Sequence, residues 1–600
     1  MNSERSGGNR MIVIGGGPAG LTAALEATNH GAIPLVLEKD HQVGGIARTD
    51  QYKGYHFDMG GHRFFTKNKE IKALWKEIMG GEFLRRPRLS RIYYQQKFFN
   101  YPLKPLNALT GLGLVQSVLI GFSYIRWQLF PFRREETFEE WVTNRFGRRL
   151  FLIFFKSYTE KVWGISCSEL KAEWAAQRIK DLSLKTALLS MIVKPGSKIT
   201  TLIEEFDYPR LGPGMMWAAF KTEIEKRGGE VRLNQEVERI ERTGQRIDAV
   251  VTGKGGAETR LTGSHFVSSM PVAEFIRKLD PPAPESVLQA AAKLHYRDFL
   301  TVCLIVNKPD LFPDNWIYIH DPSVQVGRIQ NFKNWSPDMV PDPAKTSLGL
   351  EYFCTEGDAL WTTADADLIE LAKREVDRTG LASYADVEDG CVVRVAKAYP
   401  IYDADYGDYL GQVREFVDAL ENFHTVGRNG LHRYNNQDHA MLTGLLATRN
   451  LLAGEQHDLW SVNVDQEYHE EEREETGVTP AIPVPSMPGL GAWAYAKLDR
   501  TASGLAVGTL AGVLLCAATL ILVVKGGTVI GPTLGLLGQY FPGYQVSVMG
   551  SFIGLAYGAA AGYVGGWLFA FLRNAALFTS RAILYRRAER KVLRQMLDYF

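Results

Sequence analysis

The chain has 600 residues with 68 basic and 67 acidic side chains, which give a formal net charge of +1 at pH 7. A chain of this length is expected to form two or three domains, and its balanced charge argues against a general attraction to nucleic acid. The five cysteines are scattered singly without CxxC spacing, so we expect neither a disulfide framework nor a metal site. The N-terminal residues MNSERSGGNR contain no apolar segment, so no secretory signal is expected.

Residues 11–45 predict a dinucleotide-binding unit. An apolar run predicts a buried strand that leads directly into the GxGxxG glycines Gly15, Gly17 and Gly20. The first glycine allows a tight turn, the second lets a pyrophosphate approach the backbone, and the third lets the following helix pack close to its strand. A second short strand ends at Glu38, whose carboxylate can accept hydrogen bonds from an adenosine ribose.

The residues that follow this unit favour FAD over NAD as the bound dinucleotide. A glycine-rich turn that binds nothing is the alternative interpretation of GxGxxG, but strand, helix, second strand and acidic residue occur here in order. Residues 43–49 carry a second glycine pair and resemble the corresponding segment of the glutathione-reductase-like flavoproteins. The resemblance implies non-covalently bound FAD, held by Gly15, Gly17, Pro18, Ala19, Gly20, Glu38, Lys39, Gly44 and Gly45.

Residues 55–67, YHFDMGGHRFFTK, contain paired glycines that let a backbone approach a flat ligand, followed by a histidine and an arginine. This segment resembles the one beside the flavin in UDP-galactopyranose mutases, within the larger superfamily of amine oxidases and protoporphyrinogen oxidases. The resemblance implies that Gly61 and His62 lie close to the isoalloxazine. The alternative for His62 is a structural role, with the imidazole bonded to a nearby carbonyl.

A helical and unusually apolar stretch is expected from residue 103 to about residue 194. Residues 109–130 have the length of a membrane span, but Gln116, Arg126 and Gln128 interrupt it, so we expect a buried or membrane-facing helix of a substrate domain. Aromatic residues at helical spacing follow and are typical of a core.

The segment YTEKVWG, residues 158–164, resembles one that lines the substrate cleft of the same mutases. The resemblance implies that Trp163 offers a flat face to a sugar or a base. After it, the chain is expected to return to the nucleotide domain between residues 211 and 271. Three segments there alternate like the strands of a meander, and the resemblance implies that the first brings Val237 to the adenine.

A second part of the substrate domain is expected over residues 282–396. Arg297 and Tyr352 lie in its predicted strands, and residues 399–402, YPIY, follow it. An arginine can hold a diphosphate through two hydrogen bonds and tyrosine hydroxyls can add donors, so these are candidate substrate ligands. Each has a structural role as its alternative, because sequence alone does not bring them together.

Residues 426–441 resemble the mutase segment GRxGxYxYxxxD and the helix after it, whose start touches the flavin. The pattern departs at His432, where a tyrosine is usual, and at Asn435 and Asn436. The resemblance implies that substrate or flavin is contacted by Arg433, Tyr434, Asp438 and Met441.

The C-terminal part differs in composition. An acidic run and several prolines over residues 457–500 predict a linker. Residues 504–524 and 546–572 then carry no charge, and each is long enough to cross a bilayer core of about 30 Å, although two buried core helices are the alternative. Basic residues at both outer ends predict that the catalytic domain and both termini face the cytoplasm at the plasma (inner) membrane. Residues 574–600 are expected to form a basic amphipathic helix along the anionic leaflet.

Glycines recur at every fourth residue of both spans, at Gly504, Gly508 and Gly512 and at Gly550, Gly554, Gly558, Gly562 and Gly566. Such a face lets another backbone approach closely, so the hairpin is expected to pack on itself or on another copy in a homo-oligomer.

The predicted fold is α/β. It combines a Rossmann-like FAD-binding domain of the glutathione-reductase/amine-oxidase type with an interleaved α+β substrate domain and a C-terminal two-helix transmembrane hairpin. The expected boundaries are 10–66, 201–281 and 397–456 for the FAD-binding domain, 67–200 (helical) and 282–396 for the substrate domain, 457–500 for the linker, 501–573 for the hairpin and 574–600 for the basic helix.

The resemblance covers about residues 10–455 and implies a membrane-anchored FAD enzyme that rearranges a nucleotide- or diphosphate-activated sugar through reduced flavin N5. His62 would tune N5, and Arg297 and Arg433 would neutralise the leaving diphosphate. NAD(P)H is a candidate reductant, and the substrate can be a small or a lipid-linked sugar. Two alternatives are an FAD oxidoreductase acting on an apolar substrate, like protoporphyrinogen oxidase, phytoene desaturase or amine oxidase, and a non-catalytic scaffold that retains FAD.

Overall fold

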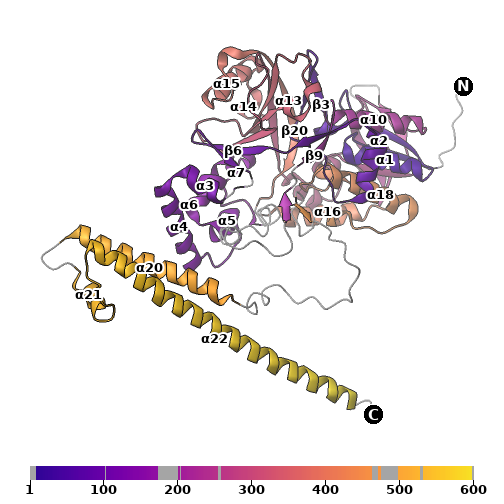
Figure 1. Cartoon of the computed structure of the whole chain (residues 1–600). Coiled ribbons are helices and arrows are strands. Elements are labelled where there is room, and N and C mark those ends of the chain that lie inside the picture. Colours follow the sequence, from indigo (N-terminus) through magenta and orange to yellow (C-terminus); the bar gives the residue numbers. More distant parts are fainter. Residues whose placement is uncertain are drawn as a thin grey trace, which may run out of the picture. The chain divides into compact units, whose positions relative to one another are not determined.

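The computed structural model of the chain divides into two compact units, Met1–Glu475 and Thr476–Phe600 (Figure 1). The boundary between them falls inside the predicted linker. The structure describes residues 9–101, 103, 105–172, 200–202, 205–253, 258–403, 405–462, 471–473, 498–526 and 531–597. Most of the predicted linker and part of the stretch expected to be helical up to residue 194 lie outside these residues.

A five-stranded parallel sheet carries the glycine turn in the first unit. Its strands, in spatial order, are β10 (Glu230–Arg232), β2 (Ile33–Leu37), β1 (Arg10–Ile14), β14 (His265–Ser268) and β21 (Phe423–Thr425). Four consecutive residues of β1 and of β2 are buried, because helices and strands cover both faces of the sheet.

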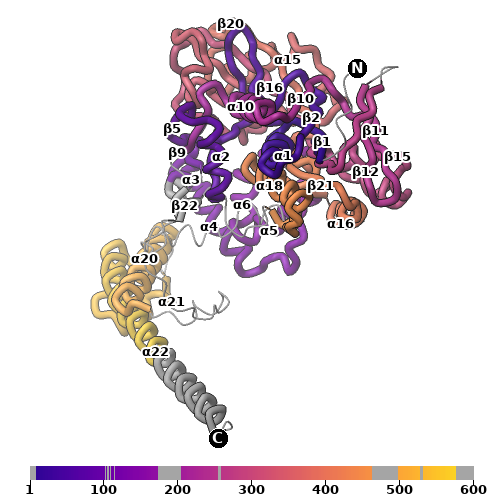
Figure 2. The backbone as a smooth tube through the Cα atoms, turned by 90° about the vertical axis from the view of Figure 1, so that its right-hand side faces the viewer, coloured from indigo at the N-terminus to yellow at the C-terminus, as the bar shows by residue number. Residues whose placement is uncertain are grey.

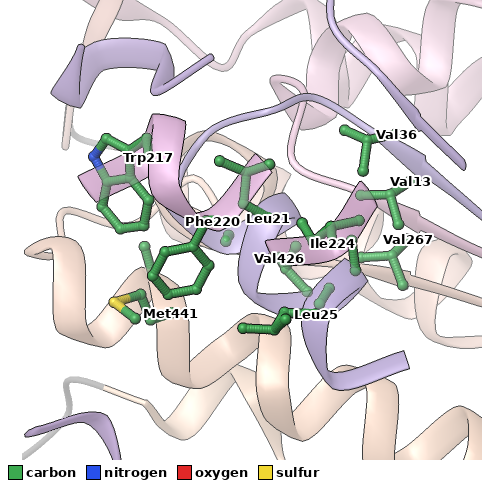
Figure 3. Close-up of a cluster of buried hydrophobic side chains, with 14 of the residues drawn as sticks. Val13, Leu21, Leu25, Val36, Trp217, Phe220, Ile224, Val267, Val426 and Met441 are labelled. Carbon is green, nitrogen blue, oxygen red and sulfur yellow. The ribbon is translucent and has the colours of Figure 1, made fainter. Parts of the chain in front are cut away.

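One face of this sheet packs against α1 (Pro18–Asn29), α10 (Gly214–Lys226) and α18 (Gln437–Ala453). Figure 3 shows Val13 and Val267 from the strands close to Leu25 of α1 and Ile224 of α10. Phe220 of α10 is fully buried in the same cluster, and removing a ring of this kind costs about 3–5 kcal/mol of folding free energy. The nucleotide turn therefore rests on a rigid base.

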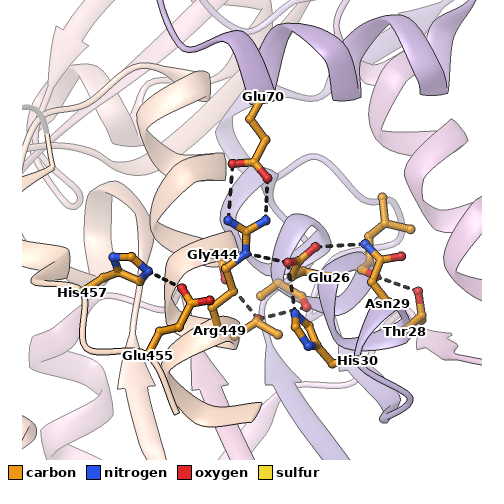
Figure 4. A network of polar contacts seen from close by, with 12 residues as sticks. Glu26, Thr28, Asn29, His30, Glu70, Gly444, Arg449, Glu455 and His457 are labelled. Atoms are coloured by element: carbon orange, nitrogen blue, oxygen red, sulfur yellow. Dashed lines mark hydrogen bonds and ion pairs between the residues drawn. The ribbon is translucent and has the colours of Figure 1, made fainter. Parts of the chain in front are cut away.

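A polar network fixes α18 to α1 and to α2 (Lys69–Met79). Arg449 of α18 donates to Glu26 of α1 over 2.8 Å and also pairs with Glu70 of α2 (Figure 4). Burial raises the pKa of Glu26, but hydrogen bonds from Arg449 and Asn29 outweigh burial and lower it. The charged network thus ties together three helices from distant parts of the sequence.

The predicted meander is only partly correct. The antiparallel strands β11 (Val237–Thr243), β12 (Arg246–Thr252) and β13 (Thr259–Thr262) form it, and β15 (Leu279–Asp280) pairs with β11 (Figure 2). The ends of the expected meander, β10 and β14, belong instead to the parallel sheet. Asn234, with φ of 55°, lies between β10 and β11 and separates the two sheets.

A seven-stranded sheet forms the second layer of this unit. Its order is β20 (Val387–Pro400), β16 (Tyr296–Val306), β19 (Thr346–Cys354), β18 (Arg328–Asn331), β17 (Trp316–Ile319), β6 (Ser90–Tyr94) and β7 (Lys97–Asn100). The strands β6 and β7 come from the part of the substrate domain that was expected to be helical. Strand β6 pairs in parallel with β17, which comes from the second part of the predicted substrate domain. The two parts therefore share one sheet.

A group of helices follows β7 in sequence. It contains α3 (Pro105–Leu112), α4 (Leu114–Leu129), α5 (Phe138–Phe146), α6 (Arg148–Leu150), the π-helical segment η2 (Phe151–Lys156) and α7 (Ser157–Trp163). The single helix expected over residues 109–130 is divided at Gly113, whose φ of 88° suits glycine. A buried or membrane-facing helix was expected here. Burial does not hold for the outer face of α4, where Val115 is 73% exposed and Phe122 67%, and a membrane-facing helix stays a prediction.

The second unit contains α20 (Arg500–Lys525) and α22 (Val548–Leu597), with the short α21 (Pro532–Gly535) between them. By length and composition, Arg500–Lys525 and Val548–Ala575 are two helices that could cross a membrane. The boundary expected at residue 573 falls inside α22, which continues without a break to Leu597.

The glycine faces of α20 and α22 meet each other. A Cβ atom on Gly508 would lie 2.5 Å from the Ala559 carbonyl oxygen, and one on Gly562 would lie 2.8 Å from that of Val507. The hairpin therefore packs on itself, as one of the two expectations stated. A homo-oligomer stays a prediction.

Candidate functional site

The glycine turn after β1 has no room for side chains. Gly15 has a φ of 99°, and a Cβ atom there would lie 2.3 Å from Ser269 Oγ. A Cβ atom on Gly20 would lie 2.0 Å from the Gly15 carbonyl oxygen, so α1 approaches the turn as closely as backbone allows. No side chain caps the start of α1, and its first amides are therefore available to a phosphate.

A cavity of about 340 Å³ begins at this turn. Glu38 lines it at the end of β2, where its carboxylate accepts the amides of Gly16, over 2.6 Å, and Asp40, over 2.9 Å. Burial raises the pKa of Glu38, and these two amides oppose the rise. The predicted cofactor residues that line this cavity are Gly15, Gly17, Pro18, Ala19, Glu38, Lys39, Gly45, His62 and Val237.

The residues that line this cavity fit FAD. The glycine turn and the open helix start suit a pyrophosphate, and the acidic side chain at the end of the second strand suits a ribose. Three other predicted cofactor residues, Gly20, Gly44 and Gly61, do not line this cavity. Gly20 packs the helix, the Gly44 amide donates to Gly16 O over 2.9 Å, and Gly61 lines a second cavity.

The assignment of Asp438 and Met441 to the flavin is not supported by their positions. Both are buried, and neither lines this cavity or the second one described below. Met441 Sδ instead accepts a hydrogen bond from Trp75 Nε1 over 3.0 Å within the core below the sheet. The start of α18 reaches the cavity through Gln437 and Ala440, because one residue along a helix turns the side chain by about 100°.

A second cavity of about 80 Å³ adjoins the first. Both are lined by Ile46, His62, Arg428, Asn436 and Gln437, so the two spaces meet at these residues. The remaining residues around the second cavity are Met59, Gly60, Gly61, Arg63, Phe65, Phe299, Arg328, Tyr399 and Tyr434. The second cavity therefore has three arginines in its wall and no acidic residue among those that line it.

Each arginine is held by a different contact. Arg328 of β18 donates through Nε to both carboxylate oxygens of Glu351, each over 2.9 Å. Burial alone would lower the pKa of Arg328, but Glu351 outweighs it and raises the pKa, so the guanidinium stays charged. The Arg63 guanidinium carbon lies 4.9 Å from the centre of the Trp316 ring.

Arg428 is fixed by backbone and by aromatic rings. It donates to the carbonyl oxygens of Ala398, over 2.9 Å, and Asn435, over 2.8 Å. Its guanidinium carbon lies 4.7 Å from the Tyr434 ring centre and 5.3 Å from that of Tyr399. The two tyrosine rings are nearly parallel, with centres 5.9 Å apart. A positive charge thus already contacts the aromatic pair in the wall of the second cavity.

His62 lies where the two cavities meet. Its Nδ1 is 2.7 Å from Asp58 Oδ1, and its backbone amide donates to Asp58 Oδ2 over 3.2 Å. The Tyr208 hydroxyl donates to the same carboxylate, and burial, with Asp58 as a further cause, raises the pKa of Tyr208. Because a carboxylate only accepts, Nδ1 carries a hydrogen, and Nε2 is the atom left for proton exchange.

Of the predicted catalytic residues, His62 and Tyr434 line the second cavity. Arg297 does not, because its guanidinium donates to Thr355 Oγ1 over 2.8 Å and to the Phe353 carbonyl over 3.0 Å. Arg433 donates to the Trp460 carbonyl over 2.6 Å and does not line the cavity either. These two arginines therefore tie backbone segments together.

The other two predicted catalytic residues are part of the core. Trp163 is 2% exposed and packs beside Tyr402 in the aromatic cluster below the seven-stranded sheet. Tyr352 is fully buried on the opposite face of β19 from Glu351, in the cluster around α15 (Asp365–Arg378). Side chains alternate along a strand, so the residue that faces the cavity arginine is Glu351.

Sequence reasoning missed Arg63, Arg328 and Arg428 as site residues. Two of them had a local signal, since Arg63 directly follows the GGH motif and Arg428 belongs to the GR pair of the later segment. Arg328 had none, because strand pairing alone brings β18 to the cavity.

The chain matches the family described as flavin containing amine oxidoreductase over residues 18–451. It belongs to this family. The match implies a flavin cofactor and places the chain in the amine oxidase superfamily of flavoenzymes, which the first two motifs indicated.

Two curated relatives are oxidoreductases by name. The chain is 25% identical over 432 residues to a coproporphyrinogen III oxidase of Mycobacterium leprae, covering 67% of this chain and 90% of the relative. It is 26% identical over 304 residues to the putative flavin-containing monoamine oxidase AofH of Mycobacterium tuberculosis, covering 47% of this chain and 61% of the relative.

Two solved structures share the fold. A reduced UDP-galactopyranose mutase aligns with a TM-score of 0.67 at 19% identity, covering 76% of this chain and 98% of that one. A putative protoporphyrinogen oxidase from Exiguobacterium sp. 255-15 aligns with a TM-score of 0.57 at 14% identity, covering 74% and 98%. At these identities the likeness concerns the fold alone, and the chemistry must be argued from the cavity.

Proposed function

We propose that the protein is an FAD-dependent mutase that rearranges a diphosphate-activated sugar. The observation that carries this proposal is the second cavity, where Arg63, Arg328 and Arg428 line a space directly beside the predicted flavin site. Guanidinium groups bind phosphate oxygens through paired hydrogen bonds, and three of them would neutralise the charge that a departing diphosphate develops.

The side chains around the second cavity would have different roles in this reaction. Arg63 and Arg428 would hold the diphosphate, while Glu351 keeps Arg328 charged and in place. Tyr399 and Tyr434 would add hydroxyl donors and a flat wall for the sugar or base. His62, fixed through Asp58, would exchange a proton through Nε2 at the junction with the flavin cavity. The reduced flavin would supply the nucleophile in this reaction, and NAD(P)H is its proposed reductant.

An amine oxidase reaction fits this cavity less well. An ammonium substrate would meet the guanidinium groups of Arg63 and Arg428, and like charges in a partly buried site repel each other. The aromatic pair that could receive an amine, Tyr399 and Tyr434, is already in contact with Arg428. The charges in the cavity wall therefore favour an anionic substrate over a cationic one.

Oxidation of a porphyrinogen is the second candidate, because the coproporphyrinogen III oxidase of Mycobacterium leprae is related over 432 residues. Arginines would also suit the carboxylates of such a substrate. A tetrapyrrole, however, is a broad apolar ring with carboxylates at its edge, and the arginines and tyrosines in the wall of the second cavity match a diphosphate and a sugar more closely.

We further propose that the hairpin of α20 and α22 anchors the enzyme in the plasma membrane, with the catalytic unit and both termini in the cytoplasm. The apolar length of both helices and the basic residues at their outer ends support this orientation. Such an anchor suits a sugar that is taken from, or passed to, lipid-linked glycan assembly.

The proposal is tested by the net reaction of the purified full chain. Reduced anaerobically with dithionite or NAD(P)H, the enzyme should convert UDP-galactopyranose or another nucleoside diphosphate sugar to a ring isomer, detected by chromatography. If no sugar is isomerised while a porphyrinogen or a lipophilic amine bleaches the oxidised flavin, the enzyme is an oxidoreductase. A preparation that binds flavin but turns over no sugar, porphyrinogen or amine would favour the non-catalytic scaffold.

A further inference from the structure

The outer face of α4 carries an unusual row of exposed apolar side chains. They recur at helical spacing and comprise Val115, Val118, Phe122, Ile125, Leu129 and Phe130. Three of them, Val115, Phe122 and Leu129, are between 67% and 73% exposed. A soluble protein rarely exposes a continuous apolar stripe of this kind unless something covers it.

Positive side chains accompany this stripe. Arg126 lies within α4, and the exposed Arg133 and Arg134 follow it, with Glu136 paired to Arg134 over 3.5 Å. At the end of α4, Arg126 lies over the rings of Trp127 and Phe130, with its guanidinium carbon 5.3 and 4.8 Å from their centres. Cations and aromatic rings at the end of an apolar helix face are typical of the interface between lipid and water.

A cavity of about 300 Å³ opens beside α4 and combines the same two chemistries. Lys97 and Arg149 bring positive charge to it, and Leu112 and Leu152 bring apolar surface. The Arg149 guanidinium is oriented by Gln116 of α4, which accepts from its Nε over 3.0 Å and from its Nη2 over 2.8 Å. Such a cavity suits the phosphate and upper acyl chain of an anionic lipid.

We propose that α4 docks the catalytic unit onto an anionic lipid bilayer, with its apolar stripe in the acyl boundary and the flanking arginines at the phosphates. The exposed face of α4 is separate from the two cavities of the candidate site. We infer lipid as its partner because the positive side chains beside it are complementary to anionic headgroups. The inference rests on the proposed anchoring of the hairpin, which would hold the catalytic unit at the membrane surface.

Photo-cross-linking in the full chain tests this docking. The photoreactive p-benzoylphenylalanine replaces Phe122, with Tyr384 of η4 (Tyr384–Asp386) as the matched position, since it is an exposed aromatic residue outside the docking surface. The chain is reconstituted into vesicles of phosphatidylcholine and phosphatidylglycerol and irradiated. We expect a mass increase equal to one phospholipid at position 122 and none at position 384.

Three other outcomes overturn the proposal. A cross-link from position 122 to residues of α20 or α22 would show that the hairpin covers the stripe, and one to a second chain would show a dimer. No adduct at position 122 would show that α4 faces water. Flotation of the vesicles after alkaline extraction reports the spanning hairpin separately, so failure of docking and failure of anchoring are distinguished.

The charge contribution is tested by Arg133→Glu combined with Arg134→Glu. Both side chains are exposed, so the variant should fold normally. We expect the lipid adduct at position 122 to fall by about fivefold or more in vesicles that contain phosphatidylglycerol, and to change little in pure phosphatidylcholine. An equal yield in both kinds of vesicle would contradict a docking surface for anionic lipid.

Discussion

The Nδ1 atom of His62 lies 2.7 Å from Asp58 Oδ1, at the place where the flavin cavity meets the arginine-lined cavity. The pair fixes which nitrogen of the ring faces the reacting groups. Asp58 is fully buried and also accepts the His62 amide and the Tyr208 hydroxyl, so the carboxylate is held from three sides. The orientation of His62 therefore depends on Asp58.

Replacing Asp58 should affect turnover more than flavin binding. Asp58→Asn presents an amide that can turn its NH2 group toward His62, and a misoriented buried partner costs about 1–3 kcal/mol, or roughly 5- to 150-fold in kcat. We expect flavin content to stay unchanged, because Asp58 lines neither cavity. Steady-state kinetics with flavin absorbance checks this, and loss of flavin in parallel with kcat would make Asp58 a residue for folding or cofactor binding.

The two kinds of arginine should separate in binding experiments. Arg63→Gln removes a charged hydrogen-bond donor from the wall of the second cavity, so the Kd for UDP should rise by about 10- to 100-fold. Arg433→Gln is the matched control, because Arg433 donates to the Trp460 carbonyl and lines neither cavity. It should lower thermal stability and leave the Kd unchanged. Calorimetric titration with UDP measures both Kd values. An equal loss of UDP affinity in the two variants would indicate that Arg433 also binds the substrate.

Two fully buried histidines predict a loss of stability in acid. Burial lowers the pKa of His320 from 6.5 to about 3 and that of His432 to about 4. The unfolded chain binds a proton near pH 6.5 and the folded chain does not, so the free energy of unfolding falls as the pH drops below 6.5. The loss is about 1.4 kcal/mol per pH unit for each histidine, until the folded pKa is reached.

His432→Phe should reduce this acid sensitivity. The variant keeps an aromatic ring against Tyr296 and removes the group that must be protonated on unfolding. The exposed His41 provides the control in His41→Phe. We expect the difference in melting temperature between pH 7 and pH 5 to shrink only in the His432 variant. The same pH dependence in the wild type and the His432 variant would exclude His432 as its source.

Local sequence patterns predicted the cofactor site better than the substrate site, for a physical reason. The turn at Gly15 and Gly20 is built from neighbours in sequence, so glycine spacing and the acidic Glu38 are visible in one short stretch. The second cavity, where we propose that the substrate binds, is assembled by the seven-stranded sheet, which brings Arg328 of β18 and Tyr399 of β20 to the same wall.

The wrongly predicted catalytic residues differ from the correct ones only in the direction or contacts of single side chains. Tyr352 and Glu351 are neighbours on β19, and only the pleat determines that the glutamate faces Arg328 while the tyrosine enters the core. Arg297 and Arg433 have the right chemistry, but neither lines the second cavity, and no sequence pattern reports that placement. The strands β6 and β7 were missed for a similar reason. Strand β6 joins the seven-stranded sheet by pairing with β17, which is more than 200 residues away in sequence.

The packing of the hairpin predicts different effects for two neighbouring glycines. Gly562→Leu would force a side chain against the Val507 backbone, whereas Gly565 has open space around it, so Gly565→Leu is the matched control. Overpacking of this kind costs about 1–3 kcal/mol. We expect faster hydrogen exchange of the α20 amides only in the Gly562 variant, measured by mass spectrometry in detergent. Equal exchange in both variants would contradict direct packing of α20 on α22.

The central claim is that the flavin takes part without net redox change, and a count of turnovers per reducing equivalent tests it most directly. The purified enzyme is reduced anaerobically with one equivalent of dithionite, the excess is removed, and a nucleoside diphosphate sugar is added while flavin absorbance is recorded. The account predicts many product molecules per flavin, with the flavin still reduced at the end. No more than one product molecule per flavin, or reoxidation of the flavin by the sugar, would contradict it.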